Sequence, residues 1–240
     1  MAQAEVSRAR GKGELFGAEQ RVYDAVFDAV MAHRLRPGTR LVESAVMRAL
    51  DLPRAVVRMG LHRLAHDRIV ELRPNRGAEV ARPTLREARE VLAARRLIEA
   101  GIVDALCGRL PAGLVESLHA LLDEASRAFA RGETATWLRL AGEFHLRLAR
   151  AHGNAELLEA LRPLVTRSIL VSALYLTPGR TLFAADTRRA LLEALGQGGS
   201  AARRAAARCI GELFDAIADG LDDAARPERA ADVERALRGV

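Results

Sequence analysis

Hydrophobic residues recur with helical spacing near the start of the chain, after a polar segment that ends near residue 15. Val22, Val26 and Val30 follow one another every four residues, which places them on one face of a helix. The sequence RPG at residues 36–38 is a turn signal that ends this helix. We therefore expect a disordered tail over residues 1–14 and a first folded region over residues 15–82.

Two shorter helices are predicted next. The DLP sequence at residues 51–53 separates them, and proline is tolerated there because the first turn of a helix leaves N–H groups without intrahelical partners. We expect an apolar inner face on each helix. This face consists of Leu41, Ala45 and Leu50 in the first helix and of Val57, Leu61 and Leu64 in the second.

Two short β-like runs, residues 69–72 and 78–80, flank a predicted hairpin tip at residues 74–77. Three helices followed by a small hairpin predict a winged helix-turn-helix, a fold that inserts one helix into the DNA major groove. Arg54 and Arg58 lie one turn apart on the third helix, opposite its apolar stripe. An arginine placed there can bind guanine O6 and N7 or clamp a phosphate.

The candidate DNA contacts lie on the outer face of this third helix and at the hairpin tip. A further candidate is Arg40, which precedes the second predicted helix. The alternative, that these arginines only solvate a surface, stays open at this point. The full set of candidates is Arg40, Arg54, Ala55, Arg58, His62, Asn75, Arg76 and Gly77.

From residue 83 onward the pattern shows no convincing strand alternation and consists of consecutive helices, which must pack as a bundle. The expected fold class is therefore mainly α: an N-terminal winged helix-turn-helix with a small β-hairpin, then an all-helical bundle over residues 83–240. The expected helices span residues 84–108, 112–131, 133–151, 154–175, 181–196 and 200–223, with a short tail helix near 228–238.

Two polar residues of the bundle fall on apolar helix faces. His145 shares its face with Leu138 and Leu148, and is either a core histidine with satisfied hydrogen bonds or part of a pocket. Arg95 also faces the core, where an unpaired cation costs several kcal/mol. Glu99, one turn further on, is its nearest partner. Arg95 is therefore either a boundary residue in a local ion pair or an anion receptor inside the bundle.

Charge separates the two regions. Residues 1–82 carry 15 Arg and Lys against 10 Asp and Glu, whereas residues 83–240 carry 22 against 21. A basic module beside a nearly neutral one indicates an anionic partner for the first. The chain contains no phosphate-binding loop, nucleophile elbow or HExxH sequence, so an enzyme with an attached basic domain is disfavoured.

The composition fits a globular protein of the cytoplasm. Of the 240 residues, 50% are hydrophobic, which is too many for a disordered chain, and no apolar run has the ~20 residues of a membrane span. The polar N-terminus lacks the apolar segment of a secretory signal. Cys107 and Cys209 are too few for a disulfide framework and suit a reducing compartment.

Three sequence runs of the first region resemble the GntR family of winged-helix regulators. They are LRPGTRLVE at residues 35–43, LPRAVVRMGLHRL at residues 52–64 and NRGAEV at residues 75–80. Arg54 and Arg58 are retained, whereas residues 51, 53, 56, 59 and 60 depart from the family pattern. In particular, Asp51 replaces a common glycine and Gly60 a common alanine. The resemblance implies the fold and DNA binding, but no operator sequence.

The bundle is similar to the FCD domain of the FadR subfamily. The similarity rests on RRLIE at residues 95–99, FH at 144–145 followed by GN at 153–154, and LLEAL at 191–195. It implies a cavity for a small carboxylate or acyl ligand. In many members of that family an aspartate and three histidines also hold a divalent metal in this cavity.

The metal ligands of that family carry over poorly onto this chain. Ala141 stands at the aspartate position, His145 is retained, Thr187 or Arg188 stands at the next histidine and Cys209 at the last. Since a zinc-like ion needs at least three protein donors, we expect no stable metal and no cofactor, with a residual site through His145 and Cys209 left open. The candidate effector-binding residues are Arg95, Ala141, His145, Thr187, Arg188 and Cys209.

The expected function is a transcriptional regulator, a repressor in our interpretation, that acts as a homodimer on a pseudo-palindromic double-stranded DNA operator in the bacterial cytoplasm. A small carboxylate or acyl effector in the bundle would change its operator affinity. The alternative is a constitutive DNA-binding regulator whose pocket no longer responds. A protein that only coats DNA would leave the nearly neutral bundle without a role. No membrane partner is expected.

Overall fold

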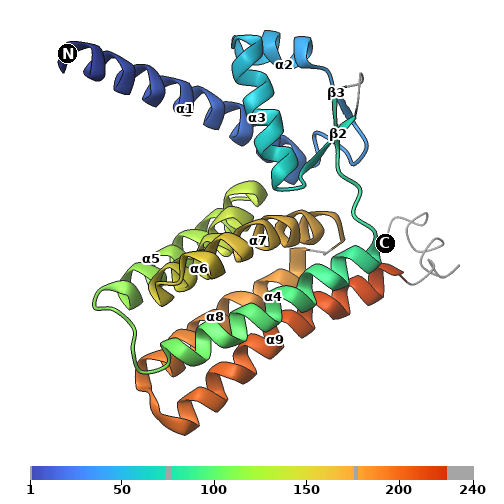
Figure 1. Ribbon diagram of the computed structural model, residues 1–240. Coiled ribbons are helices and arrows are strands. Elements are labelled where there is room, and N and C mark those ends of the chain that lie inside the picture. Colours follow the sequence, from blue (N-terminus) through green and yellow to red (C-terminus); the bar gives the residue numbers. More distant parts are fainter. Residues whose placement is uncertain (1, 74–76, 176–177, 226–240) are drawn as a thin grey trace, which may run out of the picture.

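The computed structural model of the protein describes residues 2–73, 77–175 and 178–225 (Figure 1). The first part holds three helices, α1 (Ala2–Met31), α2 (Glu43–Leu50) and α3 (Arg54–His66), and three short strands, β1 (Arg40–Leu41), β2 (Val70–Arg73) and β3 (Gly77–Val80). The remaining described residues form the helices α4 (Leu85–Leu106), α5 (Leu114–Ala130), α6 (Thr134–His152), α7 (Ala155–Tyr175), α8 (Pro178–Gln197) and α9 (Gly199–Ala225).

The small N-terminal domain has the core that its hydrophobic pattern predicts. Val22, Val26 and Val30 of α1 are buried, and the α3 stripe of Val57, Leu61 and Leu64 is buried against them. α3 approaches α1 closely at Gly60, where a Cβ atom would lie 2.5 Å from Val22 Cβ. Close apolar packing thus fixes α3 to α1.

The predicted inner face of α2 is confirmed only for Leu50, which packs against the core. Leu41 is buried but lies in strand β1, because residues 40 and 41 pair with Glu79 and Ala78 of β3 before the helix begins at Glu43. Ala45 is exposed. The side chains that pack against the core from this helix are those of Val46, Met47 and Leu50.

The wing is a three-stranded antiparallel sheet in the order β1-β3-β2. Val70 pairs with Val80 and Arg73 pairs with Gly77, which confirms the predicted hairpin. Strand β1 was not expected, because two residues are too few to show an alternating pattern.

We expect a disordered tail over residues 1–14, but residues 2–14 belong to the helix α1. The helix begins at Ala2, and its first part extends away from the other elements (Figure 1). Alanine, glutamine, glutamate and arginine, which favour helices, make up most of residues 2–10. Residue 1 is outside the described part of the chain.

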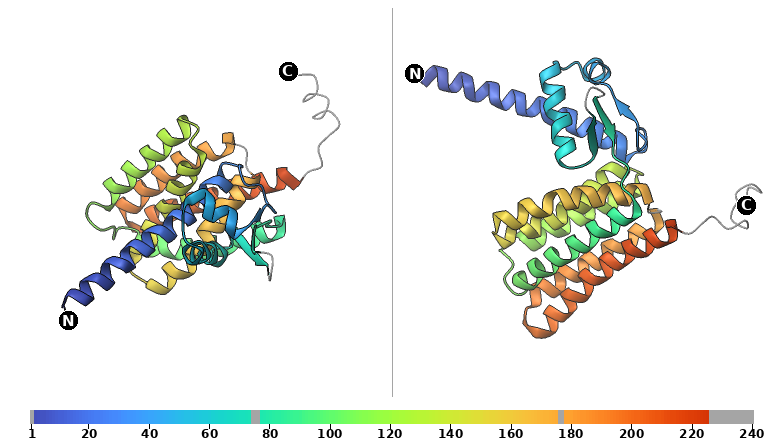
Figure 2. Two further views of the ribbon diagram at one scale, coloured as in Figure 1. Left: turned by 90° about the horizontal axis from the view of Figure 1, so that it is seen from above. Right: turned by 45° about the vertical axis from the view of Figure 1, so that its right-hand side comes forward.

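The bundle helices agree with the predicted ones to within a few residues. α4 begins with a capping box, in which the Thr84 hydroxyl accepts from the Glu87 backbone and the Glu87 carboxylate accepts from the Thr84 backbone. α8 and α9 run side by side, with α4 against α9, and α5 packs beside α6 (Figures 1 and 2). The predicted tail helix near 228–238 lies outside the described residues.

The small N-terminal domain rests on α6 and α7 (Figures 1 and 2). Leu138 of α6 and Leu170 and Ala173 of α7 belong to the same buried cluster as the core of the small domain. Arg139 adds ion pairs to Asp24 and Asp28 of α1. Within the described residues, no helix is both long and apolar enough to cross a membrane.

Candidate nucleic-acid interface and ligand cavity

The turn between α2 and α3 presents the recognition helix. Asp51, which ends α2, has φ 51° and ψ 55°, in the left-handed region that favours glycine. This geometry explains why glycine is common here in the GntR pattern, and aspartate tolerates it better than most residues. Pro53 precedes the first residue of α3 and lies at the N-cap in extended conformation.

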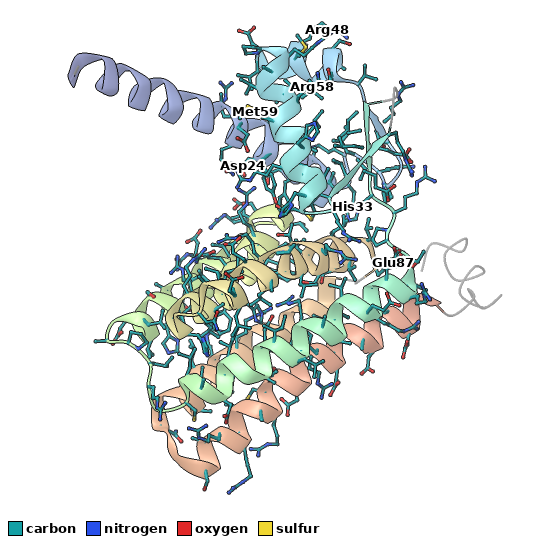
Figure 3. The ribbon with its side chains drawn as sticks, viewed as in Figure 1. Asp24, His33, Arg48, Arg58, Met59 and Glu87 are labelled. Atoms are coloured by element: carbon teal, nitrogen blue, oxygen red, sulfur yellow. The ribbon has the colours of Figure 1, made fainter. Side chains whose placement is uncertain are left out.

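Arg54 and Arg58 project from α3 into solvent, with 65% and 60% of their side chains exposed. Figure 3 shows Arg58 on this helix, in the small N-terminal domain. Glu43 of α2 lies between them, with carboxylate oxygens 3.7 Å from Arg54 Nε and 3.5 Å from Arg58 Nε. Such exposed pairs contribute only about 0–1 kcal/mol each, so phosphates can readily displace Glu43.

A surface hollow of about 610 Å³ separates α3 from the wing. Five of the eight predicted DNA contacts line it, whereas Ala55 is exposed on α3 outside the hollow. Asn75 and Arg76 lie outside the described residues. The predicted residues that the hollow brings together are Arg40, Arg54, Arg58, His62 and Gly77.

Sequence reasoning missed Arg73 and Glu43 at this surface. Arg73 ends β2 and lines the hollow while pairing with Glu71 at 2.7 Å. Its position directly before the hairpin tip was the available signal. Glu43 ends the family-like run at residues 35–43, but its contacts with α3 could not be predicted, because they arise only when α2 and α3 fold together.

A cavity of about 60 Å³ lies inside the bundle. Arg95, Ala141, His145 and Arg188 line it, as the effector prediction requires. Thr187 is buried and Cys209 half-buried, but neither is among the lining residues. The other lining residues are Trp137, Leu138, Gly142, Ser168, Ile169, Ser172, Leu213, Phe214, Ala216 and Ile217.

The predicted Arg95–Glu99 ion pair is present and buried. Arg95 Nε donates to Glu99 Oε1 at 2.7 Å, and Arg95 Nη1 donates to Ser168 Oγ across to α7. Arg95 and Glu99 are only 4% and 3% exposed. Arg95 is therefore both a member of a local ion pair and a wall of the cavity, so the two interpretations of the sequence are compatible.

Glu99 also contacts His145, whose Nδ1 lies 2.5 Å from Glu99 Oε2. Burial raises the pKa of the Glu99 carboxyl, but Arg95 and His145 outweigh burial and lower it to about 2. Burial, opposed by Glu99 and assisted by Arg95, lowers the pKa of His145 to about 4. At neutral pH Glu99 is therefore ionised and His145 is uncharged.

Arg188 is the cavity's unpaired cation. Its Nε atom is buried without a hydrogen-bond partner in the described residues, and its guanidinium carbon lies 6.0 Å from the centroid of the Phe144 ring. Burial and the like charge of Arg95 lower the pKa of Arg188 to about 10. It therefore remains charged at neutral pH.

The donor set does not fit a divalent metal. Among the residues that the structure describes, no group of three or more His, Cys, Asp or Glu side chains converges. Ala141 offers no donor atom, and Glu99 is occupied by Arg95 and His145. Burial raises the pKa of the Cys209 thiol, which disfavours the thiolate that a metal requires.

Comparison with known proteins gives two family matches. The model described as "Bacterial regulatory proteins, gntR family" matches residues 18–80, and that of the FCD domain matches residues 90–212. No curated protein matches the chain.

Solved structures share the fold. E. coli McbR/YncC is 19% identical with a TM-score of 0.71 over 86% of this chain and 97% of that one. A protein of Rhodococcus sp. RHA1, described as a GntR transcriptional regulator, is 24% identical with a TM-score of 0.71 over 87% and 99%.

Proposed function

The chain belongs to the GntR family and carries an FCD domain, and from this premise we propose that it is a repressor controlled by a small carboxylate. It is a DNA-binding transcriptional regulator and not an enzyme. The proposal divides the work between a DNA-binding domain over residues 15–82 and an effector-binding and dimerisation domain over residues 83–240.

The DNA-binding part of the proposal rests on the hollow beside α3. Arg54 and Arg58 read base edges in the major groove, because their exposed guanidinium groups lie one turn apart at the start of the helix. The other predicted residues contact the backbone or the minor groove. These are Arg40, Ala55, His62, Asn75, Arg76 and Gly77.

A homodimer follows from the small size of one DNA-binding domain. Two copies related by a two-fold axis present two recognition helices to a pseudo-palindromic operator. A dimer bound over a promoter represses transcription by excluding polymerase and needs no contact with it.

The bundle cavity supports a small effector. At about 10–15 Å³ for each water-sized volume, a cavity of about 60 Å³ holds roughly four to six such volumes. This size supports small carboxylates over long acyl chains as the proposed effector class. Arg95, His145 and Arg188 line the cavity, where charge-assisted hydrogen bonds to a carboxylate are strong.

The observation that carries the proposal is that the cavity and the DNA-binding domain share side chains. Trp137, Leu138 and Ile169 line the cavity and also pack against the core of the small domain. A ligand that moves these side chains therefore changes the docking of the DNA-binding domain, which shifts the population of operator-competent dimers.

One observation favours the alternative, a constitutive regulator with a non-responsive pocket. Glu99 already neutralises Arg95 within a buried ion pair, so one of the two cavity arginines needs no ligand. In this alternative the bundle only dimerises.

DNA selection followed by binding measurements tests the proposal. Duplexes enriched from a random pool are titrated with the protein by fluorescence anisotropy, at 50 and 200 mM salt, with and without a series of small carboxylates. We expect a palindromic site, binding that weakens steeply with salt, and at least one carboxylate that changes the affinity. A palindrome without any carboxylate response would establish the constitutive alternative. In a reporter assay, repression through the selected site is expected, and activation would refute that part.

A further inference from the structure

The charges around the bundle cavity do not cancel. Three ionisable side chains line it, Arg95, His145 and Arg188. Arg95 is paired with Glu99, and His145 is uncharged at neutral pH. Within the described residues, Arg188 has neither a hydrogen bond nor an ion pair. One positive charge therefore remains uncompensated beside the cavity.

The neighbours of Arg188 on α8 show that this isolation is a property of the position. Arg189, the next residue, pairs with Asp123 at 3.0 Å and with Asp186 at 3.4 Å on the outside of the bundle. Successive residues of a helix point about 100° apart, so these carboxylates serve Arg189 and leave Arg188 facing inward. The Arg188 side chain is partly buried, and its Nε atom is fully buried without an acceptor, so a ligand anion in the cavity would supply the missing hydrogen bond.

Two N–H groups point to the same ligand. Arg188 Nε and Arg95 Nη2 are both buried without a hydrogen-bond acceptor in the described residues, although Arg95 Nη2 lies 2.7 Å from Glu99 Oε1 as part of the ion pair. Ser172 lines the same cavity and offers a hydroxyl, whereas the Ser168 O–H already donates to the Val165 carbonyl at 2.8 Å. A carboxylate, which accepts up to four hydrogen bonds, matches this set of donors.

The rest of the wall is apolar and limits the size of the ligand. Leu213, Phe214 and Ile217 of α9 face Trp137 and Leu138 of α6 across a cavity of about 60 Å³. This surface suits a short aliphatic chain. A second carboxylate on the ligand would meet no second unpaired cation there and would have to lose its hydration without compensation.

We propose that Arg188 binds the carboxylate of a short aliphatic monocarboxylic acid directly. The proposal rests on the effector function proposed above and names its ligand class. Arg188 is the charged contact, Arg95 adds an N–H group while its charge stays with Glu99, and the apolar wall holds the aliphatic chain. Binding requires no divalent metal.

The test uses the intrinsic fluorescence of the full-length protein. Trp137 is the only tryptophan of the chain and lines the cavity, so its emission reports occupancy. Propionate and butyrate are titrated with and without EDTA, with propionamide as the neutral analogue and succinate as the dicarboxylate. We expect saturable changes with the two monocarboxylates and at least tenfold weaker binding of the other two. An effect that EDTA abolishes, or no saturable change with either monocarboxylate, would overturn the proposal.

Variants assign the charge to one residue. Arg188→Gln is expected to weaken propionate binding by about 10- to 100-fold, because hydrogen bonds to charged groups are the strong ones. Arg188→Lys should recover part of the loss. The adjacent Arg189→Gln, whose ion pairs lie outside the cavity, is the matched control and should bind like the wild type. Equal affinity in Arg188→Gln and Arg189→Gln would refute the assignment.

Two further measurements separate a binding role from a structural one and from the effector function. Without ligand, the melting temperature of Arg188→Gln should equal or exceed that of the wild type, because the variant lacks the unpaired charge at the cavity. A lower melting temperature would mark Arg188 as a structural residue. Operator affinity is then measured with saturating propionate. Binding of propionate without a change in operator affinity would refute the effector function and leave the ligand site intact. A different carboxylate that alters operator affinity equally in Arg188→Gln would refute the site and leave the effector function intact.

Discussion

Arg139 of α6 joins the bundle to α1 of the DNA-binding domain, and its replacement tests whether this junction carries a signal. Its Nη1 lies 2.8 Å from Asp24 Oδ1, its Nη2 pairs with Asp28, and its guanidinium lies 5.2 Å from the centroid of the Phe27 ring. In Figure 3, Asp24 is labelled on the part of α1 that approaches the bundle. We predict that Arg139→Gln loosens the docking of the two domains without unfolding either one.

The magnitude follows from the exposure of these groups. The Arg139 side chain is 43% exposed, so each ion pair contributes about 0.2–1 kcal/mol, and the contact with the Phe27 ring about 0.5–1 kcal/mol. Losing all three contacts makes docking less favourable by about 1–3 kcal/mol, which lowers the docking equilibrium constant by about 5- to 150-fold. The apolar contacts of Leu138 and Leu170 remain, so docking is weakened without being abolished.

Hydrogen exchange followed by mass spectrometry measures this change. Peptides from α1 and from the linker at residues 81–84 should exchange faster in Arg139→Gln, while peptides from α8 and α9 should not change. Arg150→Gln is the matched control, since Arg150 is similarly exposed on the same helix but pairs only with Glu143 of α6. Equal exchange in the two variants would show that the ion pairs of Arg139 do not hold the domains together.

Three further predictions concern the recognition helix and the bundle. Glu43→Gln should strengthen binding to any duplex, because Glu43 repels phosphates. Arg58→Ala should weaken binding to the selected site by about 1–3 kcal/mol and relax its base preference, because Arg58 reads a base edge. Anisotropy with the selected site and with a scrambled duplex measures both effects, and an unchanged affinity in either variant contradicts the interface. Gly60→Ala should lower the free energy of unfolding in urea by up to about 2 kcal/mol, because an overpacking cost of about 1–3 kcal/mol against Val22 exceeds a helix-propensity gain of about 1 kcal/mol. In the double variant with Val22→Ala this loss should shrink. Additive losses in the double variant would refute the clash. The pKa of His145 is lowered to about 4, so the unfolded state binds more protons than the folded state below about pH 6.5, and stability should fall as the pH drops from about 6.5 toward 4. The free energy of unfolding in urea, measured at pH 7.5 and at pH 5, should therefore change less in His145→Gln than in the wild type. An equal change in both proteins would refute the shift.

Helix positions could be predicted well from the sequence, because each helix buries a stripe with a period of 3.6 residues. Val57, Leu61 and Leu64 illustrate this, since their spacing alone placed Arg54 and Arg58 on the opposite, exposed face. Strand β1 and the inner face of α2 could not be predicted in this way. A two-residue strand has no period, and its pairing partners are about 40 residues away in the sequence.

The cavity shows the same limit. The inward orientation of His145 and Arg95 followed from their helix faces, but the contact of His145 with Glu99 joins two helices and has no local signal. Thr187 and Arg188 could not be distinguished by alignment, although a rotation of about 100° between neighbouring residues decides which one lines a cavity. Cys209 precedes the cavity-lining Leu213 by one turn of α9, so the family position did not transfer.

The double use of Leu138 and Ile169 constrains the engineering of hybrid sensors from this protein. Joining the bundle to an unrelated DNA-binding module would leave the apolar face of α6 and α7 exposed to water and would deform the wall of the ligand cavity. A functional hybrid must therefore bring a substitute for the hydrophobic underside of α1. Conversely, reshaping the cavity for a new inducer at these two positions would alter the resting geometry of the recognition helices, so selectivity and basal output would have to be optimised together.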